Sequence, residues 1–218
     1  MIFDRNPRAR DYKVSQLVAA IRASLESNWQ PYDHIAQLQK QWPAVRPRIS
    51  RDYLSHTTRT ALGARGPVVE CGSGLTTILL GLVAERTGIP VMTFEHDPIH
   101  HQRIKATLEI NHIRSVEILH APLVPYGDYD WYDVSQVSLP NHIQLIVCNG
   151  PPQKLTSGGR YGMWPLLESH MEPQCKILLD DYHQTSERLV TEKWSSRVQL
   201  QVESFGRMSP FSEITCRN

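Results

Sequence analysis

Four apolar runs in the chain each end in residues that can bind a ligand or move a proton. They end in residues 70–74 (ECGSG), 95–97 (EHD), 149–152 (NGPP) and 180–183 (DDYH). In an open sheet of parallel strands, ligands bind beyond the carboxyl ends of the strands. If the four runs are strands of one such sheet, we expect their final residues to meet at one edge and to form a single site.

The first of these segments, residues 70–74, is typical of a ligand-binding turn between a strand and a helix. Gly72 and Gly74 allow a tight turn and leave bare peptide groups for a ligand at the start of the helix. A dinucleotide-binding fingerprint has a third glycine at the position of Thr77, so the segment disfavours NAD. An ordinary strand-to-helix turn is the alternative interpretation.

The second segment begins with an acid, Glu95, about 20 residues after the glycines, at the position of a ribose-binding carboxylate. A carboxylate there can accept hydrogen bonds from both ribose hydroxyls. Asp97 better fits the alternative, an acid that helps to start the next helix. His96 and His100 could share a helix face, but neither a carboxylate nor a cysteine completes a metal shell, so we interpret them as solvated helix residues.

The third and fourth segments carry polar side chains that suit an acceptor substrate. Asn149 offers a donor and an acceptor, and the two prolines that follow Gly150 fix a rigid loop. Asp180 and Asp181 can position a substrate, take a proton or hold Mg²⁺. A plain turn at Asn149 and helix capping by Asp181 are the alternatives.

The elements that must position these residues follow from the apolar pattern. After residue 66, short β-rich runs alternate with longer amphipathic segments, which is typical of βαβ units and a parallel sheet. We expect strands at residues 67–71, 90–95, 116–120, 143–148 and 176–179. Helices are expected after the first, second and fifth strands and, in a shorter form, at about 161–171. Two more strands, at 197–204 and 211–216, should form an antiparallel hairpin that closes the sheet.

The chain of 218 residues fits one α/β domain with a helical N-terminal extension. We assign residues 1–65 to the extension and residues 66–218 to the ligand-binding domain. Apolar residues recur at helical spacing in residues 14–25, and two more helices are expected at 34–42 and 52–62. The segment between His120 and Ile143 is irregular, so we expect a loop that covers part of the site.

Composition argues against several classes of protein. The net charge is +1, and the 11 Lys/Arg of residues 1–66 are scattered without the interleaved aromatic residues of RNA-binding segments. No apolar run approaches the ~20 residues of a membrane span, and the N-terminus does not lead into a signal-peptide core. The four cysteines lack CxxC spacing, which favours reduced thiols over zinc or disulfides. We expect a cytoplasmic protein that binds neither nucleic acid nor membranes.

Taken in order, these motifs resemble those of class I S-adenosylmethionine-dependent methyltransferases, in particular a bacterial branch with a DGPP loop and two aspartates at a strand end. The likeness covers about residues 66–194. It rests on residues 70–74, Glu95, 121–123 (APL), 131–133 (WYD), 150–152 (GPP), Arg160, Asp180, Asp181 and 187–194. The resemblance implies a Rossmann-like α/β fold with a mostly parallel, seven-stranded sheet and an antiparallel last strand. It also implies that S-adenosylmethionine lies across Gly72, Gly74 and Glu95.

The chain departs from the family pattern at the acceptor end. Asn149 stands where the family has an aspartate, and in catechol-type relatives that acid helps the later acidic pair to hold a divalent metal. Only Asp180 and Asp181 remain as charged ligands, so we predict no metal ligands and keep Mg²⁺ as a disfavoured alternative. His120 and Ala121 replace an acid that often contacts adenine. Asn149 also resembles the start of the Asn-Pro-Pro-aromatic loop of amine and amide N-methyltransferases, but an inserted glycine breaks that match.

The resemblance implies methyl transfer from S-adenosylmethionine to a hydroxyl or amine of a small-molecule acceptor. The residues expected at the cofactor are Glu70, Cys71, Gly72, Ser73, Gly74, Thr76, Glu95, His96, Ala121 and Asn149. At the acceptor, we expect a proton to be taken by Asp180, Asp181 or His183. Asn149 and Tyr161 should orient the acceptor, and Arg160 should meet an anionic group.

Several alternatives stay open. The N-terminal helices either lie over the cofactor rim, with Tyr53 and His56 facing the acceptor, or cover a sheet edge. A non-catalytic scaffold that keeps the fold is favoured by Asn149, whereas a nicotinamide-dependent oxidoreductase is disfavoured by Thr77. The sequence leaves a homodimer open.

Overall fold

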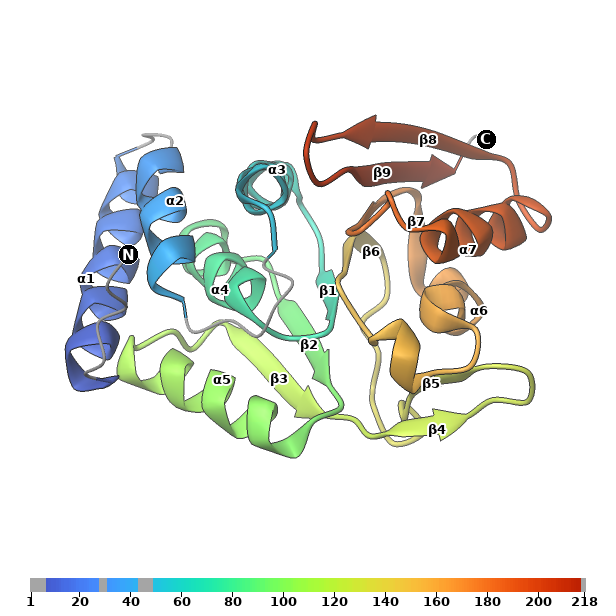
Figure 1. The fold of residues 1–218 in the computed structure, drawn as a ribbon, viewed down its shortest axis with the longest axis horizontal. Coiled ribbons are helices and arrows are strands. Elements are labelled where there is room, and N and C mark those ends of the chain that lie inside the picture. Colours follow the sequence, from blue (N-terminus) through green and yellow to red (C-terminus); the bar gives the residue numbers. More distant parts are fainter. Residues whose placement is uncertain (1–6, 28–30, 43–48, 217–218) are drawn as a thin grey trace.

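A seven-stranded sheet forms the centre of the molecule, and the computed structural model describes residues 7–27, 31–42 and 49–216 (Figure 1). The strand order is β3-β2-β1-β6-β7-β9-β8. The strands are β1 (Val68–Cys71), β2 (Val91–Glu95), β3 (Val116–His120), β6 (Ile143–Cys148), β7 (Met171–Leu179), β8 (Leu200–Phe205) and β9 (Phe211–Cys216). The first five in this order are parallel, and β9 is antiparallel to both of its neighbours. The predicted fold class is confirmed.

The central strands are buried on both faces, which explains their nearly continuous apolar sequences. Because side chains alternate along a strand, Val68 belongs to one apolar cluster and Val69 to the other. Glu70 therefore projects to the same face as Val68. On that face lies α4 (Leu75–Thr87), whose threonines meet Glu70.

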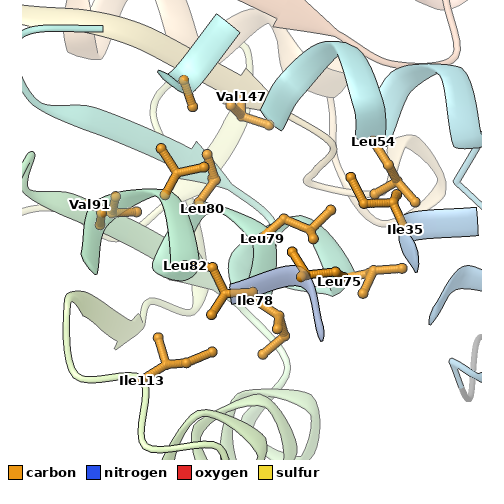
Figure 2. Packing of buried hydrophobic residues seen from close by; sticks show 14 of the residues in the cluster. Ile35, Leu54, Leu75, Ile78, Leu79, Leu80, Leu82, Val91, Ile113 and Val147 are labelled. Carbon is orange, nitrogen blue, oxygen red and sulfur yellow. The ribbon is translucent and has the colours of Figure 1, made fainter. Parts of the chain in front are cut away.

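Helix α4 lies within the first apolar cluster (Figure 2). Its residues from Leu75 to Ala84 are all buried. The N-terminal helices α1 (Pro7–Glu26), α2 (Tyr32–Gln41) and α3 (Arg51–Gly63) enclose it, and they contribute Ile35 and Leu54 to the cluster. Helix α5 (Pro98–Ile110) covers the β2–β3 side, and its N-cap is Asp97, whose side chain accepts hydrogen bonds from two backbone N–H groups of the first turn. The prediction that Asp97 starts a helix is confirmed.

The opposite face of the sheet is covered by α6 (Met163–Leu167) and α7 (Thr185–Ser195), and both Trp194 of α7 and Trp131 are fully buried in the apolar cluster on this face. The short helix expected at about 161–171 is confirmed in part, because η2 (Gly159–Gly162), α6 and η3 (Glu168–His170) follow one another without a gap and only the middle piece is α-helical. Gly158 and Gly159 have positive φ angles of 77° and 58° and separate this segment from η1 (Gln153–Leu155).

The segment expected to be irregular contains a short antiparallel hairpin, β4 (Leu123–Pro125) and β5 (Asp130–Tyr132). Its turn includes Gly127, which has a positive φ of 78°. Strands of three residues are too short to show the alternation that predicts a strand. The hairpin places Tyr132 at the centre of the molecule, close to residues 70–74, the glycine loop.

Candidate cofactor and acceptor site

The carboxyl ends of β2, β1, β6 and β7 are joined by backbone hydrogen bonds. Gly72 N–H donates to the Phe94 carbonyl at 2.9 Å, and the Cys71 carbonyl accepts from the N–H groups of Asn149 at 3.0 Å and Gly150 at 2.7 Å. Asp180 N–H donates to the Cys148 carbonyl at 3.3 Å. The four segments singled out in the sequence therefore meet at one edge of the sheet, as expected from a parallel topology.

The glycine loop uses its two glycines differently. Gly72 has a φ of 89°, and a Cβ there would lie 2.9 Å from the Gly150 nitrogen, so only glycine fits. A Cβ on Gly74 would meet no atom within 4 Å. Gly74 is also the N-cap of α4, where backbone N–H groups and the helix dipole favour an anionic or polar ligand. The surface above Gly74 thus offers space for a ligand.

Thr77, which stands where a dinucleotide fingerprint has glycine, is built into this loop. Its hydroxyl accepts from Gly74 N–H at 2.8 Å and donates to Glu70 Oε2 at 2.7 Å. Thr93 donates to the same oxygen at 2.9 Å, whereas Glu70 Oε1 is buried without a partner. Burial raises the pKa of Glu70 to about 7, against the opposing effect of the threonine hydroxyls.

Glu95 has the opposite electrostatic environment. Burial alone would raise its pKa, but contacts with His96, Ser73 and the Asp97 N–H outweigh burial and lower it to about 2. Ser73 donates to Oε2 from its backbone N–H at 3.1 Å and from its hydroxyl at 2.6 Å. Asp97 N–H donates to Oε1 at 2.9 Å, and His96 Nδ1 lies 3.0 Å from the same oxygen. Glu95 is therefore an ionised acceptor beside the glycine loop.

The edge beyond Glu95 carries Ala121 and a group of histidines. Ala121 is buried, and its N–H donates to the Glu95 carbonyl at 2.8 Å. His100 Nε2 lies 3.1 Å from the Ser73 carbonyl, and His120 Nε2 lies 3.2 Å from the His96 carbonyl. Within the described residues, no three His, Cys, Asp or Glu side chains are grouped as metal ligands.

Asn149 links β6 to the first turn of α4. Its amide nitrogen donates to Thr76 Oγ1 at 3.0 Å, while its amide oxygen is buried without a partner. Tyr132 lies nearby with its hydroxyl also buried and unpartnered, and a Cβ on Gly150 would approach that hydroxyl to 2.6 Å. Unsatisfied polar atoms, which are uncommon in folded proteins, thus gather around the glycine loop.

Arg160 is buried beneath the acceptor end, with only 5% of its surface exposed. Its guanidinium donates to the Asp180 carbonyl at 2.6 Å and to the Asn149 carbonyl at 2.8 Å, so it ties the ends of β7 and β6 together. Contacts of 3.4 Å to Asp181 and Glu187 add charge pairing. Burial disfavours the charged form, but these carboxylates raise the pKa of Arg160 further. The structure assigns Arg160 a positioning role, and its buried guanidinium does not face a substrate anion.

Asp180 and Glu187 are carboxylates with few donors. Burial and the neighbouring charge of Asp181 raise the pKa of Asp180 to about 6, although Arg160 acts in the other direction. Burial likewise raises the pKa of Glu187, again against Arg160. Asp181 has a φ of 59°, which is uncommon for a residue with a side chain, and its side chain does not cap α7. Two carboxylates therefore pair with a single guanidinium, whose charge also acts on Asp180.

The remaining predicted residues are not all at this edge. His183 is exposed beside the aspartates, and Tyr161 lies in an aromatic group with Tyr129, its hydroxyl accepting from Arg197 at 3.2 Å. Tyr53 is fully buried and donates to the Leu178 carbonyl at 3.1 Å. The expectation that Tyr53 faces an acceptor is therefore corrected, because its ring packs edge-on against Phe211 in the core.

His56 is also far from the glycine loop, because it lines a groove of about 820 Å³ at the amino ends of β6 and β7. Its Nε2 lies 2.7 Å from Glu213 Oε2, and Arg59 donates to its Nδ1 at 3.0 Å. Lys176 completes this chain by an ion pair with Glu213 at 2.6 Å. The groove is thus at the opposite end of the strands from the predicted site.

Sequence reasoning missed the roles of three residues at the site. Tyr132 and Glu187 lay in segments that carried the family resemblance, but nothing in the sequence linked them to Gly150 or Arg160. Thr77 was considered only as a missing glycine. Its position three residues after Gly74, at the third residue of the helix, is the signal that could have predicted the capping hydrogen bond.

Comparisons with known proteins support the fold. No protein-family model and no curated protein matches the chain. Among solved structures, the methyltransferase PaMTH1 of Podospora anserina, bound to SAH, has a TM-score of 0.64 and 13% identity over 85% of this chain and 87% of that one. An O-methyltransferase of Bacillus cereus in complex with SAH has a TM-score of 0.61 and 15% identity, covering 85% and 90%.

A precorrin-6y C5,15-methyltransferase of Geobacter metallireducens GS-15 has a TM-score of 0.58 and 12% identity, covering 82% of this chain and 95% of that one. The likeness to these three structures is one of fold. The chain therefore has the Rossmann-like fold of class I methyltransferases.

Proposed function

We propose that this protein is an S-adenosylmethionine-dependent methyltransferase that acts on a hydroxyl or amine of a small molecule. The observation that carries the proposal is the pairing of Glu95 with the glycine loop. An ionised carboxylate ends β2, directly beside a turn in which the open space above Gly74 admits a ligand. This pairing occurs in a fold that the chain shares with methyltransferases that bind SAH.

The residues present fit the cofactor in three respects. Glu95 can accept hydrogen bonds from ribose hydroxyls. The orphaned oxygens of Glu70 and Asn149 can accept from the amino group of the methionine part, and Ala121 supplies a small apolar wall near the end of β3. We assign cofactor contacts to Gly72, Gly74, Thr76, His96 and the backbone of Cys71 and Ser73 as well. The bound cofactor supplies an electrophilic methyl group on a sulfonium.

At the acceptor end, the chain's own residues hold the nucleophile and take its proton. Asp180, with a pKa of about 6, is ionised at pH 7–8 but remains a better base than an ordinary aspartate. Arg160 fixes its backbone, so the carboxylate is presented at a defined place on the edge of the sheet. Asn149, Asp181, His183 and Tyr161 would orient the acceptor. Burial at this edge excludes water from the reacting groups.

We do not assign Mg²⁺ to the reaction. Asn149 adds no charge at the end of β6, and Asp181 already pairs with Arg160 at 3.4 Å. A hard divalent cation prefers several free carboxylate oxygens. We further propose a small-molecule acceptor and a cytoplasmic location. No helix in the described parts of the chain combines the length and apolar character that crossing a membrane requires.

The test is a methyl-transfer assay with purified protein, labelled S-adenosylmethionine and a panel of small phenols, alcohols and amines. Asp180→Asn should lower kcat by roughly 10²–10⁴-fold, the usual contribution of a positioned acid or base, with the Kd of SAH unchanged. The exposed Glu192→Gln on α7 serves as the matched acid-to-amide control. Full activity in both Asp180→Asn and Asp181→Asn would contradict the assignment.

A second function is favoured by one feature, Asn149 in place of an acid. A non-catalytic protein that binds the cofactor and acts as a scaffold would give the same Kd for SAH but no turnover with any acceptor. A nicotinamide-dependent oxidoreductase is less favoured still, because Thr77 fills the place of the third glycine and its hydroxyl is bonded within the loop. Comparison of SAH and NAD binding separates the two cofactors.

A further inference from the structure

Glu95 is surrounded by more donors than its position at a ligand-binding edge requires. A carboxylate offers about four lone-pair sites, two on each oxygen. Oε2 faces the Ser73 N–H and hydroxyl, and Oε1 faces the Asp97 N–H and His96 Nδ1. Only 3% of the Glu95 surface is exposed. The protein therefore supplies three hydrogen bonds to Glu95 from its own chain, and His96 Nδ1 lies beside the fourth site without a hydrogen bond.

The four groups around Glu95 fall into two kinds. The N–H groups of Ser73 and Asp97 belong to the backbone, which is held by the Gly72–Phe94 hydrogen bond and by the start of α5. The Ser73 hydroxyl and the His96 ring are side chains that can rotate without moving the loop. A ribose presents two hydroxyls, so it needs two of the four positions. Only the two side chains can release them.

We propose that the Ser73 hydroxyl is an internal competitor for the cofactor ribose, and that its displacement from Glu95 sets the affinity for the cofactor. The inference rests on the proposed function, since it concerns the same site. At 2.6 Å, the Ser73–Glu95 hydrogen bond is the shortest that Glu95 makes and is charge-assisted, which makes it a strong bond to exchange. Ser73 thus opposes binding, although it lies in the cofactor loop.

The surroundings of Ser73 allow this exchange. His100 Nε2 lies 3.1 Å from the Ser73 carbonyl, which fixes the backbone while leaving the side chain free to turn. Ser73 is only partly buried, and a Cβ on the neighbouring Gly74 would meet no atom within 4 Å. The two backbone donors remain on Glu95 during the exchange and keep the carboxylate ionised. Ser73 therefore acts on affinity without changing the charge of the site.

The experiment is a titration of wild type and Ser73→Ala with SAH by calorimetry, together with thermal unfolding with and without saturating SAH. Ser73→Ala should bind SAH about three- to tenfold more tightly, because one net hydrogen bond to a charged group no longer has to be broken. The Tm of the cofactor-free variant should fall, whereas the Tm of the SAH-saturated variant should match that of the saturated wild type. If Ser73 merely supported the loop, Ser73→Ala would bind SAH more weakly than the wild type.

Two controls make the result specific. Ser115→Ala removes a hydroxyl that donates to the Gly81 carbonyl at 2.7 Å, away from Glu95, and should leave the Kd of SAH unchanged. In a Glu95→Gln background, the effect of Ser73→Ala should shrink to less than about twofold, since the two residues act through one interaction. Unchanged or weaker binding in Ser73→Ala would overturn the inference alone. Failure of the wild type to bind SAH would overturn the proposed function, and the inference with it.

Discussion

Glu95 and Asp180 both end strands at the same edge of the sheet, yet their surroundings shift their pKa values in opposite directions. Glu95 is held at about 2 by backbone and side-chain donors that overcome burial. Asp180 is raised to about 6 because burial and the charge of Asp181 exceed the effect of Arg160. The comparison teaches that the number of donors aimed at a buried carboxylate decides whether it binds as an anion or takes a proton.

The same contrast extends to the two halves of the site. At the cofactor half, polar groups form a closed network among Glu95, Ser73 and Asp97. At the acceptor half, Arg160 donates its shortest hydrogen bonds to backbone carbonyls, at 2.6 and 2.8 Å. Its contacts with carboxylates are longer, at 3.4 Å. The acceptor half therefore keeps excess negative charge. Three experiments would break or sharpen this contrast.

The largest effect is expected from removal of the guanidinium that supports the acceptor half. Arg160→Met should lower the free energy of unfolding by about 3–5 kcal/mol, because buried carboxylates and two carbonyls lose their partner. Urea denaturation followed by tryptophan fluorescence measures the change. Arg197→Met removes an exposed arginine that pairs with Glu168 at 3.6 Å, and it should have little effect. If Arg160→Met lowered the free energy of unfolding no more than Arg197→Met, the carbonyls and carboxylates around Arg160 would not depend on it.

A pair of matched substitutions should have opposite signs. The pKa of Glu95 is lowered on folding, so its charge stabilises the fold above about pH 4, and Glu95→Gln should cost about 2–3 kcal/mol at pH 8. The pKa of Asp180 is raised on folding, so ionisation costs stability as the pH rises from about 4 to 6. Asp180→Asn should therefore stabilise the protein by about 2–3 kcal/mol at pH 8.

Urea denaturation at pH 8 and at pH 4.5 measures both variants, with the exposed Asp52→Asn as control. The stabilisation by Asp180→Asn should largely disappear at pH 4.5, since most of the folded wild type is then protonated at that site. Two variants that shift stability in the same direction at pH 8 would remove the contrast on which this interpretation depends.

The smallest effect separates two glycines of the site. A Cβ at position 150 would approach the Tyr132 hydroxyl to 2.6 Å, so Gly150→Ala should cost about 1–3 kcal/mol through overpacking. Gly74→Ala meets no protein atom within 4 Å and should change stability by less than about 1 kcal/mol. If the cofactor lies over Gly74, that variant should nevertheless bind SAH more weakly. Normal binding by a stable Gly74→Ala protein would place the cofactor elsewhere.

Much of the fold could be predicted from sequence, because parallel strands buried on both faces leave continuous apolar runs. Residues 116–120 and 143–148 became strands with the predicted bounds. The β4–β5 hairpin was missed, since three-residue strands carry no periodicity. The short helix predicted at about 161–171 is present, but the helical pattern did not reveal that its two ends are 3₁₀ turns.

The candidate site was less predictable at the acceptor half than at the cofactor half. Strand order and register bring Glu95 and the glycine loop together. Each of these two motifs can be recognised from local sequence. Arg160 and Tyr53 were expected to meet a substrate, but the free carbonyls at the ends of β6 and β7 bind them instead. Which backbone carbonyls need a side-chain donor depends on three-dimensional packing, and residue types in the sequence do not indicate it.

The central claim, that the edge formed by Glu95 and the glycine loop binds S-adenosylmethionine, is tested most directly by calorimetric titration of SAH into wild type and Glu95→Ala. We predict a Kd in about the micromolar range for the wild type, and a Kd raised about a hundredfold in the variant, as expected for the loss of charge-assisted hydrogen bonds. No binding to the wild type, or equal binding to both proteins, would contradict the claim.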